Sequence, residues 1–261
     1  MKLLNSNLFR SIRHKLADEN QFLKYSRYAI GEIVLVVIGI LIALQINNQN
    51  EERKTRTKEL VYLRNIKADF ELNKASIEEF MKAREDCIKS SEVLIDLFEG
   101  KRELNLNEFN YHAIMVMVWF PFHPQDNTYQ ELMNSGNLAL ISNKSIKDGL
   151  QNMQSSFKAI AFIEGEMQQD YESYLYDIYF STADLNASME NFDQQINNEI
   201  GRSTIDLSLS EVENLLQNRT FKNGIVLAKY NSALLIEEYK KIISNTTKLR
   251  QLIDNESETK P

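Results

Sequence analysis

The apolar stretch from Ala29 to Ile46 constrains this chain more than any other part of its sequence. Its eighteen residues, AIGEIVLVVIGILIALQI, include twelve Ile, Leu or Val and a single ionisable group, Glu32. A helix of this length measures roughly 27 Å at ~1.5 Å per residue, just enough to cross the hydrocarbon core of a bilayer. The aliphatic side chains favour insertion by roughly 4 to 7 kcal/mol, whereas a carboxylate at mid-membrane opposes it by about 3 kcal/mol. We therefore interpret residues 29–46 as a transmembrane anchor.

The charges beside this anchor indicate its orientation. Residues 1–28 carry six basic and two acidic groups, a net charge of +4, which leaves −11 for the rest of the chain because the total is −7. Basic segments favour the cytoplasmic side of a membrane. We therefore expect a cytoplasmic, basic and amphipathic tail over residues 1–28, and a periplasmic C-terminal domain at a bacterial inner membrane. Lys24, Tyr25, Arg27 and Tyr28 are candidate anchors in the membrane interface.

The rest of the sequence favours an all-α fold. It has only eight Gly and three Pro in 261 residues, and neither occurs from Ile40 to Glu99. This composition favours long helices over a turn-rich sheet. We predict a stalk over residues 47–59 that continues the anchor, a helical extracytoplasmic domain over 60–254 and a frayed tail over 255–261. No small-x-small cleavage pattern follows the apolar core, so we expect the anchor and the domain to remain joined.

Three local patterns predict details of the helical domain. Gly100 follows the long apolar periodicity and is expected to end the first helix. The segment 107–120 contains eight consecutive apolar residues at its end, which favours a fully buried helix over a strand. Ser210 and Glu213 have the spacing of a capping box and are expected to begin one long final helix.

Two segments of the sequence resemble a known family. Residues 13–53, RHKLADENQFLKYSRYAIGEIVLVVIGILIALQINNQNEER, are similar to the N-terminal hallmark of domain-of-unknown-function family 6090, an uncharacterised family of single-pass envelope proteins abundant in Bacteroidota. TYQELMNSGNLALISN at 128–143 resembles the family's central segment. The family's usual Asn-Trp after the span is Asn48-Gln49 here, which removes an interfacial aromatic residue. The resemblance implies membrane location and architecture, and supplies no activity, ligand or catalytic residue.

One face of the anchor combines a carboxyl group with small residues. Glu32, Gly39 and Ala43 lie on the same side of a helix, and Gly39 with Ala43 forms the small-xxx-small spacing that allows another helix to approach closely. We hypothesise that this seam docks a second span, either from another copy of the chain or from another membrane protein. The alternative is that Glu32 reaches the interface beside Lys24 or Arg27 while Gly39 is incidental.

Few residues indicate site chemistry in the domain. Glu108, His112, His123 and Asp126 flank the proline-bearing corner, but their spacing matches no metal motif, so we expect no metal and no cofactor. The single cysteine, Cys87, is expected to be a small buried apolar residue. The tyrosines that follow residue 170 have helical spacing, which is more typical of a core than of a ligand pocket.

Several functions are disfavoured by composition and by missing motifs. The acidic charge of the large part disfavours a nucleic-acid partner. The sequence has no glycine-rich phosphate loop, HExxH, GxSxG or paired cysteine, so we expect no catalytic residue and no enzyme activity. The leading hypothesis is a non-catalytic, membrane-anchored interaction or scaffold subunit of a cell-envelope assembly. The alternative is a small-ligand sensor that signals through a partner membrane protein.

Overall fold

The computed structural model describes residues 6–197 and 207–258, and the regular elements within these ranges are all helical. They are α1 (Ser6–Phe98), α2 (Leu106–Met117), α3 (Asn127–Asn134), a 3-10 turn (Asn137–Leu140), α4 (Lys144–Tyr171), a π-helical turn (Glu172–Tyr176), α5 (Asp177–Thr182), α6 (Leu185–Ile196), α7 (Leu209–Gln217) and α8 (Arg219–Glu258). The prediction of an all-α fold with a long N-terminal helix and a helical bundle is confirmed.

The first helix contains the apolar stretch and continues without a break into the bundle. It ends at Phe98, and Gly100 adopts a left-handed conformation with φ of 67°, as its position in the sequence predicts. Its apolar window has a mean hydropathy of 2.6, and none of that window is buried against the described residues. This part of α1 is therefore long and apolar enough to cross a membrane. The chain divides into two compact units between Lys58 and Glu59.

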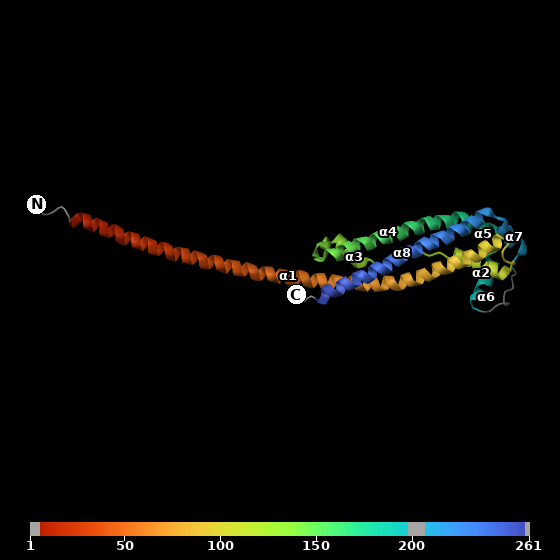
Figure 1. Ribbon diagram of the computed structural model, residues 1–261, viewed down its shortest axis with the longest axis horizontal. Helices are drawn as coiled ribbons and strands as arrows, with labels where there is room; N and C mark the ends of the chain where they lie inside the picture. Colours follow the sequence, from red (N-terminus) through yellow and green to blue (C-terminus); the bar gives the residue numbers. More distant parts are fainter. Residues whose placement is uncertain (1–5, 198–206, 259–261) are drawn as a thin grey trace. The chain divides into compact units, whose positions relative to one another are not determined.

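In the second unit, three long helices lie side by side. α1 from Glu59 onward, α4 and α8 run along one another, whereas α2, α5, α6 and α7 gather at one end and α3 lies towards the other (Figure 1). α4 and α8 run in opposite directions, because Asn231 bonds to Asp170 at 2.9 Å while Tyr239, later in α8, bonds to Glu164, earlier in α4, at 3.1 Å. The apolar stripes of the helices meet in one core, whose fully buried members include Leu63, Ile66, Ile77, Leu94, Leu132, Ile146, Ile160, Leu235 and Ile242.

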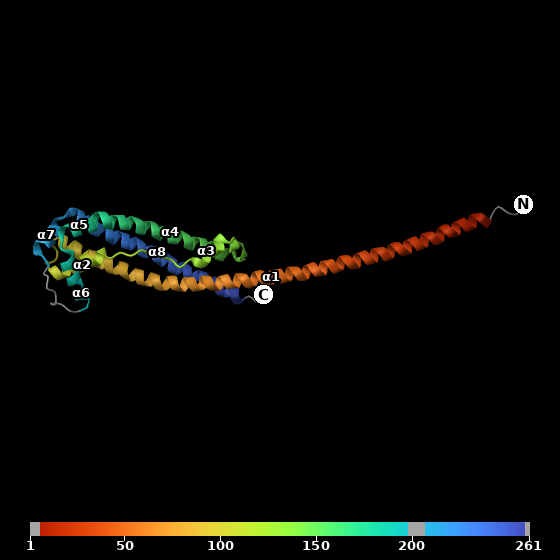
Figure 2. The ribbon, with the colours of Figure 1, turned by 180° about the vertical axis from the view of Figure 1, so that it is seen from behind.

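The chain between α2 and α3 is extended, and we call residues 118–126 the strap. The sequence correctly predicts α2 as a buried helix, but α2 ends at Met117 rather than at Phe120. The residue before a proline disfavours helical backbone, and Pro121 therefore acts against a helix that reaches Phe120. Val118 is already extended, with ψ of 116°. The strap then runs along the bundle from α2 towards α3 (Figure 2).

The C-terminal helices begin elsewhere than the sequence predicts. Ser208, rather than Ser210, is the N-cap of α7, and its hydroxyl accepts a bond from the Glu211 N–H at 3.4 Å. The expected capping box of Ser210 and Glu213 is therefore wrong by two positions. The single final helix is also wrong, because Asn218 is extended and its side chain accepts the Phe221 N–H at 3.0 Å. An asparagine side chain readily accepts a backbone N–H in the first turn of a helix. Asn218 therefore caps α8, which begins as a helix separate from α7.

α8 passes very close to the π-helical turn at Gly224. A Cβ added there would lie 2.9 Å from the backbone oxygen of Tyr174 and 2.7 Å from a methyl group of Leu175. The backbone oxygen cannot move away without moving the π-helical turn. We therefore expect Gly224→Ala to lower the free energy of unfolding by about 1–3 kcal/mol, the usual cost of overpacking. Urea unfolding of the full-length protein in mild detergent, followed by circular dichroism, measures this loss.

Gly165 in α4 provides the matched control for this substitution. It is also a helical glycine, but it is exposed and a Cβ added to it would meet nothing within 4 Å. Alanine is the better helix former, so Gly165→Ala should be neutral or should stabilise the protein by up to about 1 kcal/mol. Equal losses of stability from the two substitutions would contradict the close approach at Gly224.

Candidate functional site

The strap is held largely through its main chain, by polar side chains from α1. The Asn73 amide donates to the Gln125 carbonyl oxygen at 2.8 Å and accepts the Gln125 N–H at 2.7 Å. Arg84 donates through Nη2 to the carbonyl oxygen of Phe120 at 3.1 Å. Both side chains are buried. Because backbone groups carry these bonds, the strap's position depends little on which side chains it presents outward.

Glu164 of α4 binds the strap from the other side and connects it to two further helices. Both of its carboxylate oxygens accept the Phe122 N–H, at 3.1 and 3.0 Å, and Oε1 also accepts the Tyr239 hydroxyl of α8 at 3.1 Å. Arg84 Nη2 lies 3.7 Å from Oε1. Glu164 and Arg84 are each only 3% exposed. A buried ion pair therefore joins α1, α4, α8 and the strap.

The surroundings of Glu164 act on its pKa in opposite directions. Burial raises the pKa of the carboxyl group above its ordinary value, while the Phe122 N–H, the Tyr239 hydroxyl, Arg84 and His123 act to lower it. Burial has the larger effect. Burial and the adjacent carboxylate also raise the pKa of the Tyr239 hydroxyl, so this group remains a donor at neutral pH.

The Glu164 environment predicts how stability varies with pH. A raised pKa in the folded protein means that this residue's contribution is fully present below the ordinary value of 4.5 and is lost as the pH rises through the folded value. Glu164→Gln keeps the shape but has no titrating carboxyl group. The free energy of unfolding of the wild type, minus that of Glu164→Gln, should therefore fall as the pH rises from about 4.5 towards neutrality. A difference that grows over this range, in unfolding titrations at each pH, would contradict the assignment.

A pocket of aromatic residues receives the strap's one deeply buried side chain. The Phe122 ring is 5% exposed and lies 5.6 Å from the Phe80 ring, 6.1 Å from Phe157 and 6.1 Å from Tyr239, measured between centroids. These spacings lie within the favourable range for aromatic pairs. Phe120, two residues earlier on the strap, is 67% exposed. Main-chain bonds and one aromatic anchor thus fix the strap between α1 and α4.

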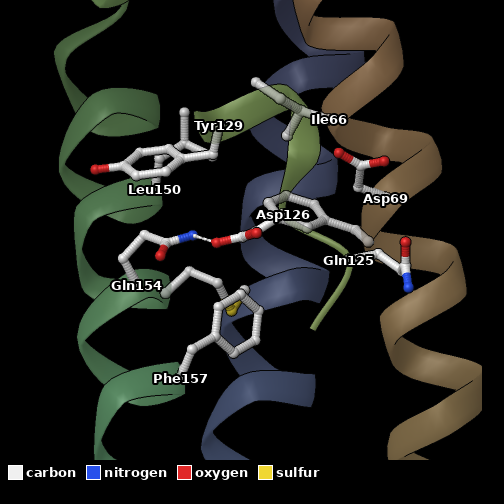
Figure 3. A pocket seen from close by; sticks show the side chains of 10 residues that line it. Ile66, Asp69, Gln125, Asp126, Tyr129, Leu150, Gln154 and Phe157 are labelled. Atoms are coloured by element: carbon white, nitrogen blue, oxygen red, sulfur yellow. Dashed lines mark hydrogen bonds between the residues drawn. The ribbon is translucent and has the colours of Figure 1, made fainter. Parts of the chain in front are cut away.

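A small cavity lies at the end of the strap next to α3. Residues of α1, the strap, α3 and α4 line it, including Asp69, Gln125 and Tyr129, and Asp126 accepts a bond from Gln154 at 3.0 Å there (Figure 3). Its volume of about 20 Å³ is enough for a water molecule. Pockets for small ligands typically measure about 300–1,000 Å³. The cavity as it stands therefore fits water rather than an organic ligand.

The four residues considered as metal ligands are not brought together. Among the described side chains, which exclude residues 1–25, 28, 198–206 and 259–261, no group of three or more His, Cys, Asp or Glu has a metal-binding arrangement. Three of them have partners of their own: Glu108 pairs with Arg102, His112 bonds to Ser90, and Asp126 accepts from Gln130 and Gln154. Glu108, His112 and Asp126 therefore take part in local side-chain interactions instead.

Most of the other side chains singled out in the domain are buried or half-buried. Cys87 is buried, as predicted, and its sulfur lies 3.6 Å from the Tyr171 hydroxyl. Tyr171 and Tyr179 are each 1% exposed. The Tyr176 ring is half-buried and stacks on Phe180 at 5.5 Å. The interpretation of the tyrosine-rich stretch as core therefore holds for Tyr171 and Tyr179, whereas Tyr174 and Phe180 are exposed.

The proposed seam of the anchor lies on the exposed surface of α1. Glu32, Gly39 and Ala43 are exposed, and a Cβ added at Gly39 would meet nothing within 4 Å. Of the candidate interface anchors, Arg27 is exposed, whereas the side chains of Lys24, Tyr25 and Tyr28 lie outside the described residues. Docking of a second span at this seam stays a prediction.

The segment 128–143 packs against the first turns of α1 in the second unit. The Ser142 N–H and hydroxyl both donate to Glu59 Oε1, at 2.6 and 2.8 Å, and Glu59 is 2% exposed. The Tyr62 hydroxyl donates to Glu131 at 2.9 Å. The second stretch that resembles the family therefore fastens α3 and the start of α4 to α1.

Arg84 and Glu164 were missed by sequence reasoning, although a signal was present. Glu164 occupies a core position in the apolar periodicity of α4, four residues after Ile160 and three before Met167. Arg84 lies between Phe80 and Cys87 in α1. A charged residue at a core position requires a partner, because a buried and unpaired charge is very costly. Two such positions of opposite charge predict a buried pair.

Comparison with known proteins assigns the family. Residues 32–187 match the family of unknown function DUF6090, and this match includes most of the apolar stretch together with α2, the strap and α4. No curated protein and no solved structure matches the chain. The match covers more than half of the 261 residues. The chain therefore belongs to the DUF6090 family.

Proposed function

We propose that the chain is a non-catalytic, membrane-anchored interaction or scaffold subunit of a bacterial cell-envelope assembly. The observation that carries this proposal is the exposed apolar window of α1, which continues as the same helix into a folded helical domain. Such an arrangement holds the domain at a membrane surface. The absence of catalytic motifs from the sequence supports a binding role over a chemical one.

The proposed location is the inner membrane, with residues 1–28 in the cytoplasm and the helical domain in the periplasm. The net charge of +4 on residues 1–28 supports this orientation, since basic segments favour the cytoplasmic side. A sensor of small ligands is less well supported, because the cavity at the end of the strap measures only about 20 Å³.

Crosslinking in intact cells tests the proposal. After mild crosslinking, the full-length protein should co-purify with one or a few proteins in reproducible stoichiometry. Gly39→Leu and Ala43→Leu should reduce capture if the seam docks a partner span, because bulky side chains prevent close approach of helices. Ile38→Leu is the matched control within the same span. Recovery of the protein alone, as a monomer under all crosslinking conditions, would refute the scaffold role.

A further inference from the structure

Helix α6, at the end of the bundle where α2, α5 and α7 gather (Figure 1), carries a stripe of apolar side chains. Its members are spaced by four, three and four residues and therefore share one face of the helix. They are Leu185, Met189, Phe192 and Ile196, and we call them the α6 stripe. Leu185, Met189 and Ile196 are 42%, 47% and 55% exposed, whereas Phe192 is half-buried against the Tyr111 ring of α2 at 5.6 Å. The described part of the bundle thus leaves most of the α6 stripe open to solvent.

Polar side chains, rather than the α6 stripe, fasten α6 to α2. The Asn191 amide donates to Asn107 Oδ1 at 2.8 Å and accepts a bond from Asn110 at 3.0 Å. Gln195 donates to the Asn107 carbonyl oxygen at 2.9 Å, and Asn110 donates to the Ser188 carbonyl oxygen at 2.8 Å. These bonds hold α6 in place through a different face of the helix. The α6 stripe therefore remains available to another molecule.

The sequence around the α6 stripe is strongly acidic. Residues 159–201 contain nine Asp or Glu and no Lys, Arg or His. Glu190 and Asp193 lie on α6 itself, each directly after a residue of the α6 stripe. A second copy of α6 would bring the same charges and be repelled, and an anionic lipid surface would be repelled for the same reason. The charge therefore favours a segment that has Lys or Arg beside its apolar residues.

The length of the α6 stripe indicates how strong a contact it can make. From Leu185 to Ile196 the helix rises by roughly 16 Å, and its width is about 10 Å. A face of this size covers far less than the ~800 Å² per partner of a standard protein interface. It therefore cannot support a stable dimer of two α6 helices. A weak contact becomes effective when the partner is held at the same membrane, because tethering raises its local concentration.

We propose that the α6 stripe docks a basic amphipathic helix of a partner protein. The apolar residues of that helix, spaced by three and four positions, pack against Leu185, Met189 and Ile196, as in other cases where one helix is recognised through its apolar face. Its Lys or Arg side chains lie beside Glu190 and Asp193. This inference rests on the interaction role proposed above and names the chemistry of the partner.

Photocrosslinking of a designed peptide to the full-length protein, in a neutral detergent, tests the site. The probe is a helical peptide with Leu at alternating intervals of three and four residues, Lys beside them, and a benzophenone at one Leu position. Crosslinks should map to residues 185–196. In the double variant Met189→Ser with Ile196→Ser the yield should fall about tenfold, because two anchors are lost. An unchanged yield in this variant would overturn the proposal.

The matched control removes two exposed apolar side chains elsewhere on the bundle. Tyr230 and Leu234 of α8 are 65% and 56% exposed, and Tyr230→Ser with Leu234→Ser should keep the wild-type yield. Because every variant is surrounded by the same detergent, peptide bound to the micelle contributes equally to all of them. Equal losses from the two double variants would overturn the assignment to α6.

A second peptide, with Glu in place of every Lys, separates charge from apolar contact. It should crosslink several-fold less than the Lys peptide, and added salt should narrow the difference because it screens the charges. Equal yields for the two peptides at low salt, or crosslinks spread over the whole domain, would overturn the proposal.

Two further outcomes would identify a different occupant of the α6 stripe. Met189→Ser with Ile196→Ser should change the Tm by less than about 2 °C, because both residues are exposed. A fall of more than about 5 °C would show that the chain itself covers the α6 stripe. In a Cys87→Ala background, disulfide-linked dimers that form more readily with Met189→Cys than with Tyr230→Cys would show that a second copy covers it. Either result overturns the proposal.

Crosslinking in intact cells separates this inference from the scaffold role. Loss of a captured partner from Met189→Ser with Ile196→Ser, together with the peptide crosslinks, supports both. If this variant captures the same partners as the wild type, the α6 site is overturned and the scaffold role stands. If the cells yield the chain alone while the Lys peptide still crosslinks to residues 185–196, the scaffold role fails and the helix-binding face of α6 stands.

Discussion

Glu164→Ala should lower the free energy of unfolding by about 3–5 kcal/mol, one of the two largest losses that we expect from a single substitution. The substitution leaves Arg84 as a buried charge without its partner, and it leaves the Phe122 N–H and the Tyr239 hydroxyl without their acceptor. Urea unfolding of the full-length protein in detergent measures the loss. A change below about 1 kcal/mol would show that the buried pair does not hold the bundle together.

A double substitution separates the charge from the hydrogen bonds. In Arg84→Met with Glu164→Leu, no unpaired charge remains, and apolar replacements of buried pairs are often neutral or stabilising. The double variant should therefore be more stable than Glu164→Ala. It should still fall short of the wild type, because the Phe122 N–H remains without an acceptor. Direct coupling between Arg84 and Glu164 would be contradicted if the double variant lost as much stability as Arg84→Met alone and Glu164→Leu alone lose in sum.

Phe122→Ala should lower the free energy of unfolding by about 3–5 kcal/mol, because it empties a pocket lined by three aromatic rings. The loss should concentrate in the strap, whose other interactions are largely main-chain hydrogen bonds. Hydrogen exchange of residues 118–126 should therefore accelerate more than exchange in α4. Unfolding curves and exchange rates together measure both effects.

Phe120→Ala is the matched control on the same strap. The Phe120 side chain is 67% exposed, and the bond that the residue makes to Arg84 uses its carbonyl oxygen, which alanine retains. The substitution should change stability by no more than about 0.5 kcal/mol. Equal losses from Phe120→Ala and Phe122→Ala would mean that the strap is not anchored by the aromatic pocket.

The features predicted from the sequence are those that depend on neighbouring residues. The apolar run, the left-handed stop at Gly100 and the buried helix before Pro121 all follow from local periodicity and backbone preference. The start of α7 was misplaced because Ser208 and Ser210 are both good caps within two residues. Local sequence cannot distinguish between them without the packing that follows.

The strap and its contacts could not be predicted in the same way. Arg84 and Phe120 are 36 positions apart, Glu164 and Phe122 are 42 apart, and Glu164 and Tyr239 are 75 apart. Such pairings depend on how α1, α4 and α8 pack, which periodicity does not specify. The sequence does show charged residues at core positions, but it does not show which backbone groups they bind.

Membrane insertion and orientation can be measured on one pair of single-cysteine proteins. In a Cys87→Ala background, Ala161→Cys places a thiol on the exposed face of α4, and Ser11→Cys places one in the N-terminal tail. The account predicts that both proteins stay in the membrane pellet after alkaline carbonate extraction. An impermeant thiol reagent should label the Ala161→Cys protein in intact spheroplasts, and the Ser11→Cys protein only after permeabilisation. Release of the proteins into the carbonate supernatant, or the reverse labelling pattern, would contradict the membrane-anchored account.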